Sequence, residues 1–124
     1  MTEPQKDHRA SRIDFPELLS RVDNDRELLC ELLGIFKEDF PRHLRALQDA
    51  VARQDLKQAA TLSHTLKGML SNLSVTRAAS EAAQVEQSAH QGSLTAVQTA
   101  LTAFELEVQG LTAEMDTHMV EVRH

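Results

Sequence analysis

One histidine stands where it could carry a chemical group. It lies in the stretch "SHTLKGMLSNL", residues 63–73, whose apolar residues recur at helical spacing. On a helical wheel that advances by about 100° per residue, His64 points away from the leucines of this stretch. An exposed imidazole can act as a nucleophile or carry a proton. His64 is therefore the first candidate functional residue.

The neighbours of His64 on the same helical face favour a group that becomes negatively charged. Lys67 lies one helical turn away and could pair with the oxygens of a phosphoryl group on the ring nitrogen. Gly68 costs about 1 kcal/mol relative to alanine inside a helix, which suggests that something approaches the backbone there. The residues expected on this outer face, and hence available to a docking partner, are Lys57, Ala60, Thr61, Lys67, Gly68 and Ser71.

The remaining residues of chemical interest have no comparable setting. Cys30 is the only cysteine, so it forms no disulfide within the chain, and its place on an apolar stripe is typical of a small buried residue. No metal site is expected. The other histidines are expected to be solvated, and they are His8, His43, His90, His118 and His124.

Composition predicts one all-α domain. The chain has 124 residues, rich in the helix formers alanine, leucine, glutamine and glutamate, with no Trp or Tyr. A net charge of −6, with the histidines neutral, disfavours general binding to nucleic-acid phosphates. No apolar run is long enough to span a membrane, and the first residues lack the apolar centre of a signal peptide. We therefore expect a cytoplasmic protein that binds neither nucleic acid nor membrane.

Cap residues and apolar spacing predict where the first two helices begin. Asp14 is expected to cap a short helix that could lie on the domain as a lid. Asn24, with Glu27 three residues later, is expected to begin a helix that runs to about Val51. Pro41 should kink this helix rather than end it, because the apolar spacing continues on both sides.

Three further helices are predicted after the second. Asp55 is expected to cap the helix that carries His64, and an alanine-rich helix follows at about 75–90. Gly92 and Ser93 are expected to separate that helix from the last one, which has the most regular spacing of apolar residues in the chain.

Short connections determine the predicted architecture. Because they force successive helices to run antiparallel, we expect an up-down four-helix bundle over residues 13–118, with a short extra N-terminal helix in front. The flanking segments, 1–12 and 119–124, are expected to be flexible.

The run "HTLKG" followed by "NLS" resembles the signature of histidine-phosphotransfer (Hpt) domains, in which His-x-Leu-Lys-Gly precedes an apolar residue and a small one. The family's first two helices are similar to the opening stretch "DFPELLSRVDNDRELLCELLGIFKEDFPRHLRAL". The resemblance covers about residues 13–118 and implies the same four-helix bundle. Ser74 departs from the glycine that is usual after the leucine, which concerns the turn there and not the histidine.

The resemblance implies a role for particular residues. His64 would be the phosphoacceptor, and Lys67 would assist the phosphoryl group. Gly68 would give a receiver domain room to dock. Glu86 falls where family members often carry a polar residue near the histidine ring, so it could accept a hydrogen bond from Nδ1 and leave Nε2 free to attack.

The same resemblance implies a phosphocarrier of two-component signalling with no kinase activity of its own. His64 would attack in line an aspartyl phosphate in the Mg²⁺ site of a receiver domain, and the phosphoryl group would pass later to a second receiver aspartate. The expected partners are response-regulator receiver domains and a sensor histidine kinase, such as a hybrid kinase. The chain itself would need no cofactor and would be a monomer.

Three alternatives differ from this hypothesis. The dimerising domain of a histidine kinase would be a dimer and would need an ATP-binding domain with glycine-rich boxes, which this chain cannot supply. A di-metal bundle would need Glu-x-x-His pairs on two helices, whereas the only such spacing is Glu121 to His124. A helical docking or adaptor protein with the Hpt shape but without phosphorylation stays open, although both His64 and Lys67 are present.

Overall fold

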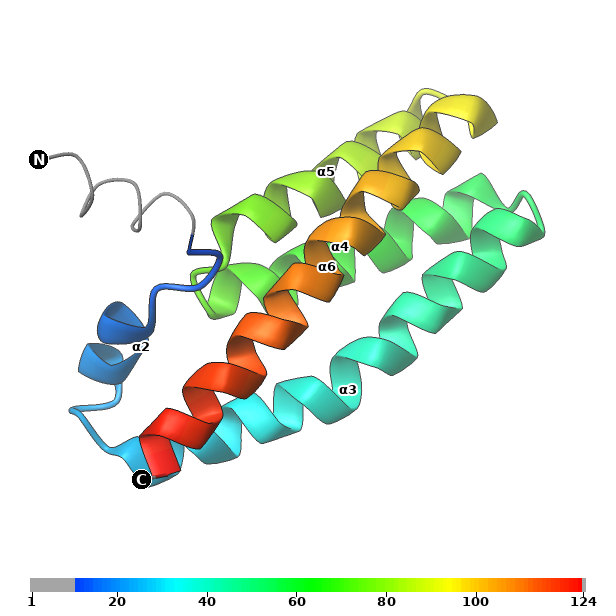
Figure 1. Cartoon of the computed structure of the whole chain (residues 1–124). Coiled ribbons are helices and arrows are strands. Elements are labelled where there is room, and N and C mark those ends of the chain that lie inside the picture. Colours follow the sequence, from blue (N-terminus) through cyan, green and yellow to red (C-terminus); the bar gives the residue numbers. More distant parts are fainter. Residues whose placement is uncertain (1–10, 124) are drawn as a thin grey trace, which may run out of the picture.

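Helices make up almost all of the described part of the chain. The structure is a computed structural model that describes residues 11–123, and this range contains no strand. Its helices are α2 (Phe15–Arg21), α3 (Arg26–Ala52), α4 (Leu56–Asn72), α5 (Thr76–His90) and α6 (Leu94–Arg123). Helices α3 to α6 run up and down in an antiparallel bundle with α2 in front, which confirms the predicted fold class (Figure 1).

Side-chain caps begin four of the five described helices, whereas α5 starts after Val75 without one. Three caps stand where the sequence predicts them, and each accepts a hydrogen bond of 3.1 Å from the backbone N–H three residues ahead: Asp14, Asp55 and Ser93. Helix α3 differs by one residue, because Asp25 rather than Asn24 caps it and accepts from the N–H of Leu28 at 3.0 Å. Asn24 instead lies in the preceding turn with φ of 61°, a backbone conformation that asparagine tolerates better than most residues.

The turn at Ser74 keeps the shape that a glycine would give it. Its φ of 57° lies in the left-handed region, where glycine is the most favourable residue. The N–H of Val75 donates to the carbonyl of Leu70 at 3.0 Å and closes the end of α4. The Ser74 hydroxyl also accepts a hydrogen bond of 2.6 Å from Nη1 of Arg21, which links this turn to α2.

Helix α6 supplies the longest apolar stripe of the core. Phe104 is fully buried, and its ring meets that of Phe40 edge-on at 6.3 Å between centroids. Phe40 in turn stacks on Phe36 at 4.7 Å, and α3 continues through Pro41. The buried residues of α6 recur at the predicted three-and-four spacing, and they are Val97, Leu101, Phe104, Val108, Leu111 and Met115.

Helices α4 and α5 form the most closely associated pair of the bundle. The small buried side chains of Ala78 and Ala82 on α5 suit this close packing. Ser63 of α4 is fully buried, and its hydroxyl is satisfied within its own helix, where it donates to the carbonyl of Ala59 at 2.6 Å. The prediction that Ala60 of α4 is available to a docking partner is wrong, because Ala60 is only 5% exposed.

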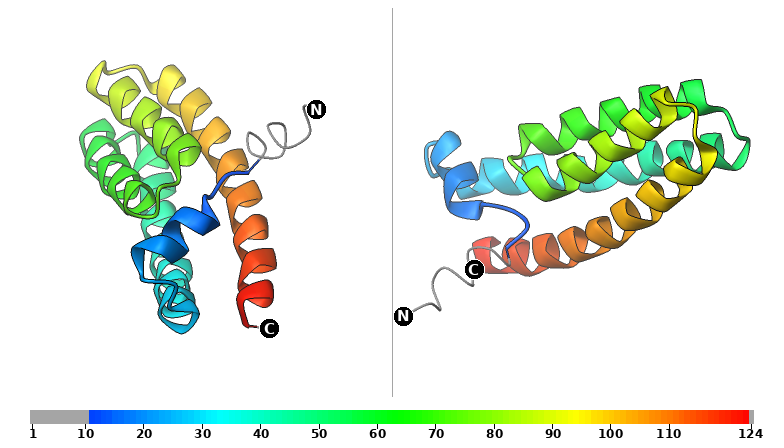
Figure 2. Two further views of the ribbon diagram at one scale, coloured as in Figure 1. Left: turned by 90° about the vertical axis from the view of Figure 1, so that its left-hand side faces the viewer. Right: turned by 90° about the horizontal axis from the view of Figure 1, so that it is seen from above.

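Helices α3 and α6 extend together beyond α4 and α5, and α2 lies at that end of the bundle (Figures 1 and 2). Phe15 and Leu18 of α2 are buried there. The Phe15 ring stacks on His118 of α6 at 4.1 Å, so His118 is half-buried rather than solvated as predicted. Helix α2 is thus a lid on the extended part of the bundle.

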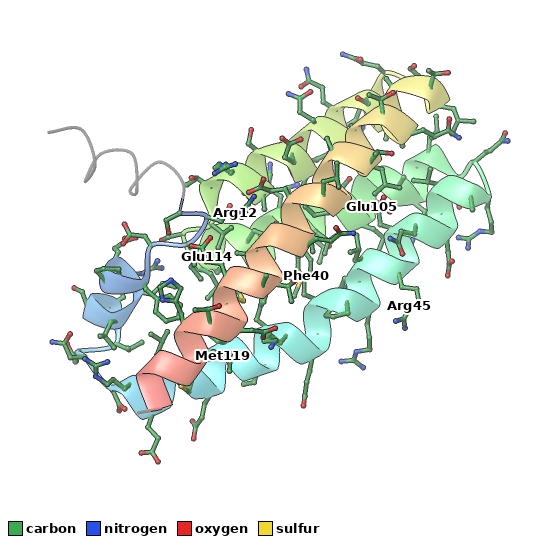
Figure 3. The ribbon with its side chains drawn as sticks, viewed as in Figure 1. Arg12, Phe40, Arg45, Glu105, Glu114 and Met119 are labelled. Atoms are coloured by element: carbon green, nitrogen blue, oxygen red, sulfur yellow. The ribbon has the colours of Figure 1, made fainter. Side chains whose placement is uncertain are left out.

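The structure describes parts of both ends that were predicted to be flexible. Residues 119–123 belong to α6, and Met119, labelled in Figure 3, packs against the core. Of the predicted lead-in, residues 1–10 lie outside the described part of the chain, as does residue 124. Ser11 and Arg12 are attached to α6 by side-chain contacts.

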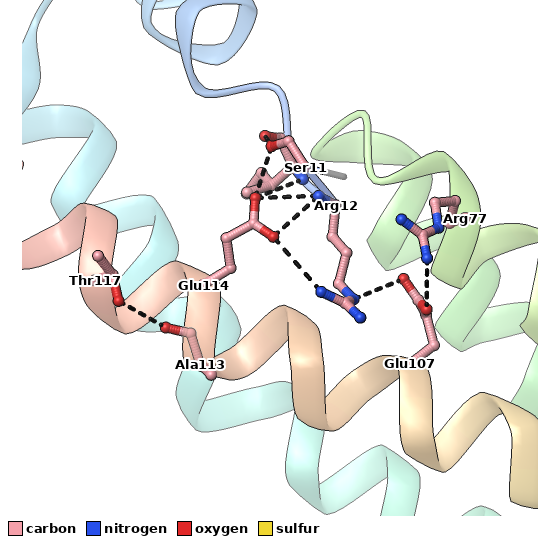
Figure 4. Close-up of polar contacts among 8 residues, drawn as sticks. Ser11, Arg12, Arg77, Glu107, Ala113, Glu114 and Thr117 are labelled. Carbon is pink, nitrogen blue, oxygen red and sulfur yellow. Dashed lines mark hydrogen bonds and ion pairs between the residues drawn. The ribbon is translucent and has the colours of Figure 1, made fainter. Parts of the chain in front are cut away.

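A polar network fixes the segment before α2 (Figure 4). The Glu114 carboxylate accepts hydrogen bonds from the Ser11 hydroxyl at 2.7 Å and from the Arg12 N–H at 3.0 Å. The Arg12 Nε lies 3.1 Å from Oε2 of Glu107, and Arg77 of α5 pairs with the other oxygen of Glu107 at 3.5 Å. The hydrogen bonds of Ser11 and Arg12 with Glu114 join residues that are 103 and 102 positions apart in the sequence.

Gly110 lies beneath this network. A Cβ at this position would overlap the guanidinium of Arg12, so any other residue here would make the end of the arginine side chain shift. A glycine inside a helix costs about 1 kcal/mol relative to alanine. Here the space above it holds the guanidinium of Arg12, which pairs with Glu107.

The fold should depend on pH through Glu114. Burial raises the pKa of this carboxyl, but hydrogen bonds from Ser11, Arg12 and Ile13 and the charge of His118 outweigh burial and lower the pKa below 4.5. A carboxyl whose pKa is lower in the folded state stabilises the fold above its unfolded pKa, and this contribution is lost as the pH falls through the folded pKa. Glu114→Gln should therefore be less stable than wild type at neutral pH, by a difference that shrinks below pH 4.5.

Urea unfolding at about pH 7 and about pH 3 checks this prediction, because it gives the free energy of unfolding at each pH. Glu31→Gln, at an exposed position of α3, is the matched control and should change little at either pH. A difference between Glu114→Gln and wild type that stays constant across this range would contradict the prediction.

Candidate functional site

His64 lies midway along α4, its side chain is exposed, and one of its ring nitrogens contacts a carboxylate of α5. Its side chain is 66% exposed, and its Nδ1 lies 3.1 Å from Oε2 and 3.4 Å from Oε1 of Glu86 on α5. An ionised carboxylate only accepts hydrogen bonds, so Nδ1 of a neutral ring beside it carries the proton and Nε2 carries the lone pair. The site therefore combines an accessible imidazole with a fixed tautomer.

Glu86 is placed by the packing of α4 against α5 rather than by sequence proximity. Its side chain is 19% exposed, well below that of His64. Lys67 of α4 also reaches it, with Nζ 3.7 Å from Oε1. The structure thus brings together the three residues predicted to do the chemistry, and Lys67 pairs here with Glu86.

The predicted docking residues other than Ala60 are exposed around His64. Gly68 has open space where a Cβ would stand, because no heavy atom of a neighbour lies within 4 Å of that point. No contact among the described residues 11–123 therefore requires a glycine here, whereas at Gly110 a Cβ would meet Arg12. The exposed residues of the predicted docking surface are Lys57, Thr61, Gly68 and Ser71, while Lys67 is half-buried.

Comparison with known protein families gives one match. A family model described as the Hpt domain matches residues 31–116. The chain belongs to the Hpt domain family. Searches of curated proteins and of solved structures gave no significant match.

Membership has direct consequences for the class of function. Hpt domains are phosphocarrier modules of two-component signalling, have no intrinsic kinase activity, and interact with receiver domains and kinases. The matched range holds all of α4 and α5, and so it contains His64, Lys67 and Glu86.

This Hpt domain has one further residue at the site that the sequence analysis missed. Nε2 of His90 lies 3.7 Å from Oε2 of Glu86, although His90 was expected to be solvated like the other histidines. Its side chain is 67% exposed, so it is solvated as predicted, but the sequence analysis did not foresee that it lies beside Glu86. The four-residue spacing from Glu86 on one helix was the signal that could have revealed it.

A groove lies on the side of Lys67 toward α2. Its volume is about 700 Å³, and it lies between the fixed segment before α2, the end of α4 and the start of α5. Lys67 and Ser71 line one wall, and Arg12 lines another. The polar network of Glu114 therefore also shapes the surface next to the Hpt site.

The part of the Hpt domain that the structure describes contains neither a candidate metal site nor a candidate membrane-spanning helix. No three or more histidine, cysteine, aspartate or glutamate side chains gather in a way that could hold a metal ion. In the same residues, no helix combines the length and apolar character needed to cross a membrane.

Proposed function

We propose that this Hpt domain relays a phosphoryl group between aspartates of receiver domains through a phosphohistidine at Nε2 of His64. The observation that supports it most directly is the contact of 3.1 Å between Nδ1 and the Glu86 carboxylate on an imidazole that is 66% exposed. This contact leaves Nε2 as the nucleophile and provides a negative charge for the ring when it becomes positive.

The proposed step is an in-line displacement at phosphorus. A bond forms between Nε2 and the phosphorus as the bond between the phosphorus and the receiver's aspartate oxygen breaks, and the aspartate leaves as a carboxylate. The Nδ1 proton stays on the ring, and Glu86 balances the resulting positive charge. The reverse displacement delivers the phosphoryl group to the aspartate of a second receiver.

The receiver supplies the rest of the chemistry in this proposal. Its Mg²⁺ balances the charge on the transferred group, so this chain needs no cofactor of its own. Lys67 is close enough to turn from Glu86 toward the phosphoryl oxygens once these arrive. Gly68 and the exposed residues around it are the docking surface for the receiver.

The proposal includes a monomeric protein that works in the cytoplasm between a sensor histidine kinase, such as a hybrid kinase, and its response regulators. A mass measured in solution distinguishes this from the dimeric phosphoacceptor domain of a kinase.

Phosphotransfer from phosphorylated receiver domains tests the proposal. The purified protein and a His64→Gln control are mixed with each receiver of the same organism, and phosphate that is labile to acid but stable to alkali is measured on the chain. Label on the wild type and none on the control is the expected result. A folded wild-type protein that no receiver labels would instead favour a docking or adaptor protein with the Hpt shape.

Glu86→Gln should slow this transfer by about five- to ten-fold. Glutamine can still accept the hydrogen bond from Nδ1, but it brings no negative charge to the ring, and charge-assisted hydrogen bonds are roughly twice as strong as neutral ones. The initial rate of phosphorylation by a receiver measures the effect. A transfer rate equal to that of the wild type, in a variant with unchanged helix content, would exclude this role for the carboxylate.

A further inference from the structure

Three side chains that can donate a proton or carry positive charge lie close to the carboxylate of Glu86. Its Oε1 lies 3.7 Å from Nζ of Lys67, and its Oε2 lies 3.7 Å from Nε2 of His90 and 3.1 Å from Nδ1 of His64. Two of these neighbours come from α4, whereas His90 lies on α5 with Glu86 itself. The carboxylate is therefore held from both sides.

The proposed function requires that one of these contacts changes. A phosphoryl group on Nε2 of His64 brings about two negative charges next to Lys67, one helical turn away. A single ammonium group cannot hold Glu86 and the phosphoryl oxygens with full strength at once. If Lys67 turns to the phosphoryl group, Glu86 keeps the positive ring of His64 but loses the ammonium group, while the phosphoryl group leaves a net negative charge at the site.

His90 is placed to supply the missing counter-charge. It is the last residue of α5, where the partial negative charge of the helix end lies, and its Nε2 is 3.7 Å from Oε2 of Glu86. Glu86 is the charged group beside it, and Lys67 and His64 of α4 are the charged or titratable groups on the far side of that carboxylate. Its spacing from Glu86 on one helix does not depend on what happens at α4.

We infer that His90 is a positioning residue for phosphotransfer, whose protonated imidazole balances Glu86 and so releases Lys67 to the phosphoryl group. The inference rests on the proposed role of His64. His90 forms and breaks no covalent bond in it, and the proton on Nδ1 of His64 stays in place throughout.

Chemical phosphorylation tests this without any receiver domain. Phosphoramidate transfers its phosphoryl group to an imidazole nitrogen as ammonia leaves, so it reports on the site and not on docking. The rate of labelling at His64, located by mass spectrometry of peptides, and the half-life of the phosphohistidine are measured for wild type, His90→Ala, His90→Gln and His90→Lys. Each is measured at about pH 6 and about pH 8.5, on either side of the range in which histidines lose their charge.

At the lower pH, His90→Ala and His90→Gln should be labelled about two- to five-fold more slowly than wild type, the range expected for one exposed ion pair. The half-life of their phosphohistidine should shorten by a similar factor, because Lys67 stays with Glu86. His90→Lys should match the wild type, because it keeps a cation in place. At the higher pH, wild type and His90→Ala should converge, and His90→Lys should exceed both.

A double-mutant cycle with Lys67→Ala shows whether His90 acts through the lysine. If it does, His90→Ala should have no further effect in the Lys67→Ala background. The same fold-change in both backgrounds, a wild-type rate for His90→Ala at the lower pH, or full rescue by His90→Gln would each overturn the inference.

The outcomes also separate this inference from the proposed function. Labelling by phosphoramidate with the expected His90 pattern, together with no transfer from any receiver, would support the inference and contradict the relay. Transfer from a receiver, together with no effect of the His90 substitutions, would support the relay and contradict the inference. A folded wild-type protein that phosphoramidate does not label at His64 would contradict both.

Discussion

Gly68→Gln should slow phosphoryl transfer from a receiver domain by about 100-fold or more while the bundle stays at least as stable as wild type. The new side chain meets nothing within the chain, because no neighbouring atom lies within 4 Å of the position of its Cβ. Glutamine also has a higher helix propensity than glycine, by somewhat less than about 1 kcal/mol. The loss of transfer would come from a receiver held away from His64, since a displacement of about 1 Å can cost about 100-fold in rate.

Two controls show whether docking is the step affected. Labelling of Gly68→Gln by phosphoramidate should equal that of the wild type, because this small donor needs no docking surface. Gly34→Gln on α3, another helical glycine with open space at its Cβ position, should transfer phosphate normally. Equal receiver transfer in Gly68→Gln and wild type would show that the partner does not approach α4 at this residue.

Phe104→Ala should lower the free energy of unfolding by about 3–5 kcal/mol, the largest effect expected of a single core substitution here. Phe104 is fully buried and its ring packs against that of Phe40, so truncation leaves a cavity between α6 and α3. Urea unfolding followed by circular dichroism measures the loss. A small domain has a total stability of about 5–15 kcal/mol, so this loss is a large share of it.

Leu106→Ala is the matched control for this prediction. Leu106 lies on the same helix, two residues away, but is 63% exposed. Its truncation removes little buried surface, and we expect a change within about 0.5 kcal/mol. Similar losses in both variants would mean that α6 does not bury the face containing Phe104.

Much of the fold follows from local signals in the sequence. The stripe of α6 and the caps Asp14, Asp55 and Ser93 are visible because a helix requires apolar residues at fixed spacing and acceptors for its first N–H groups. Contacts between distant segments leave no such signal. The attachment of Arg12 to α6 was missed for this reason, although Gly110 inside an otherwise regular helix was an indication that something crosses there.

The site shows the same division. The helical wheel correctly places His64 and Gly68 on an exposed face, because that depends on α4 alone. It fails for Ala60, which is only 5% exposed, because a wheel drawn for one helix cannot show how closely its neighbours pack against it. The position of Glu86 against Nδ1 depends on the relative rotation of two helices and came from the family resemblance, whereas the contact of His90 was not anticipated at all.

The lid has a consequence for where the folding unit ends. The family match begins at residue 31, after four side chains that belong to the buried core, Ile13, Phe15, Leu18 and Leu29. Burying side chains of this size contributes about 1.5–3 kcal/mol each, so a fragment cut to the matched residues would lose a sum comparable with the whole stability of a small domain. It would also leave Glu114 without its N-terminal hydrogen-bond donors. The part that defines the family is therefore shorter than the part that must fold for His64 to be held in place.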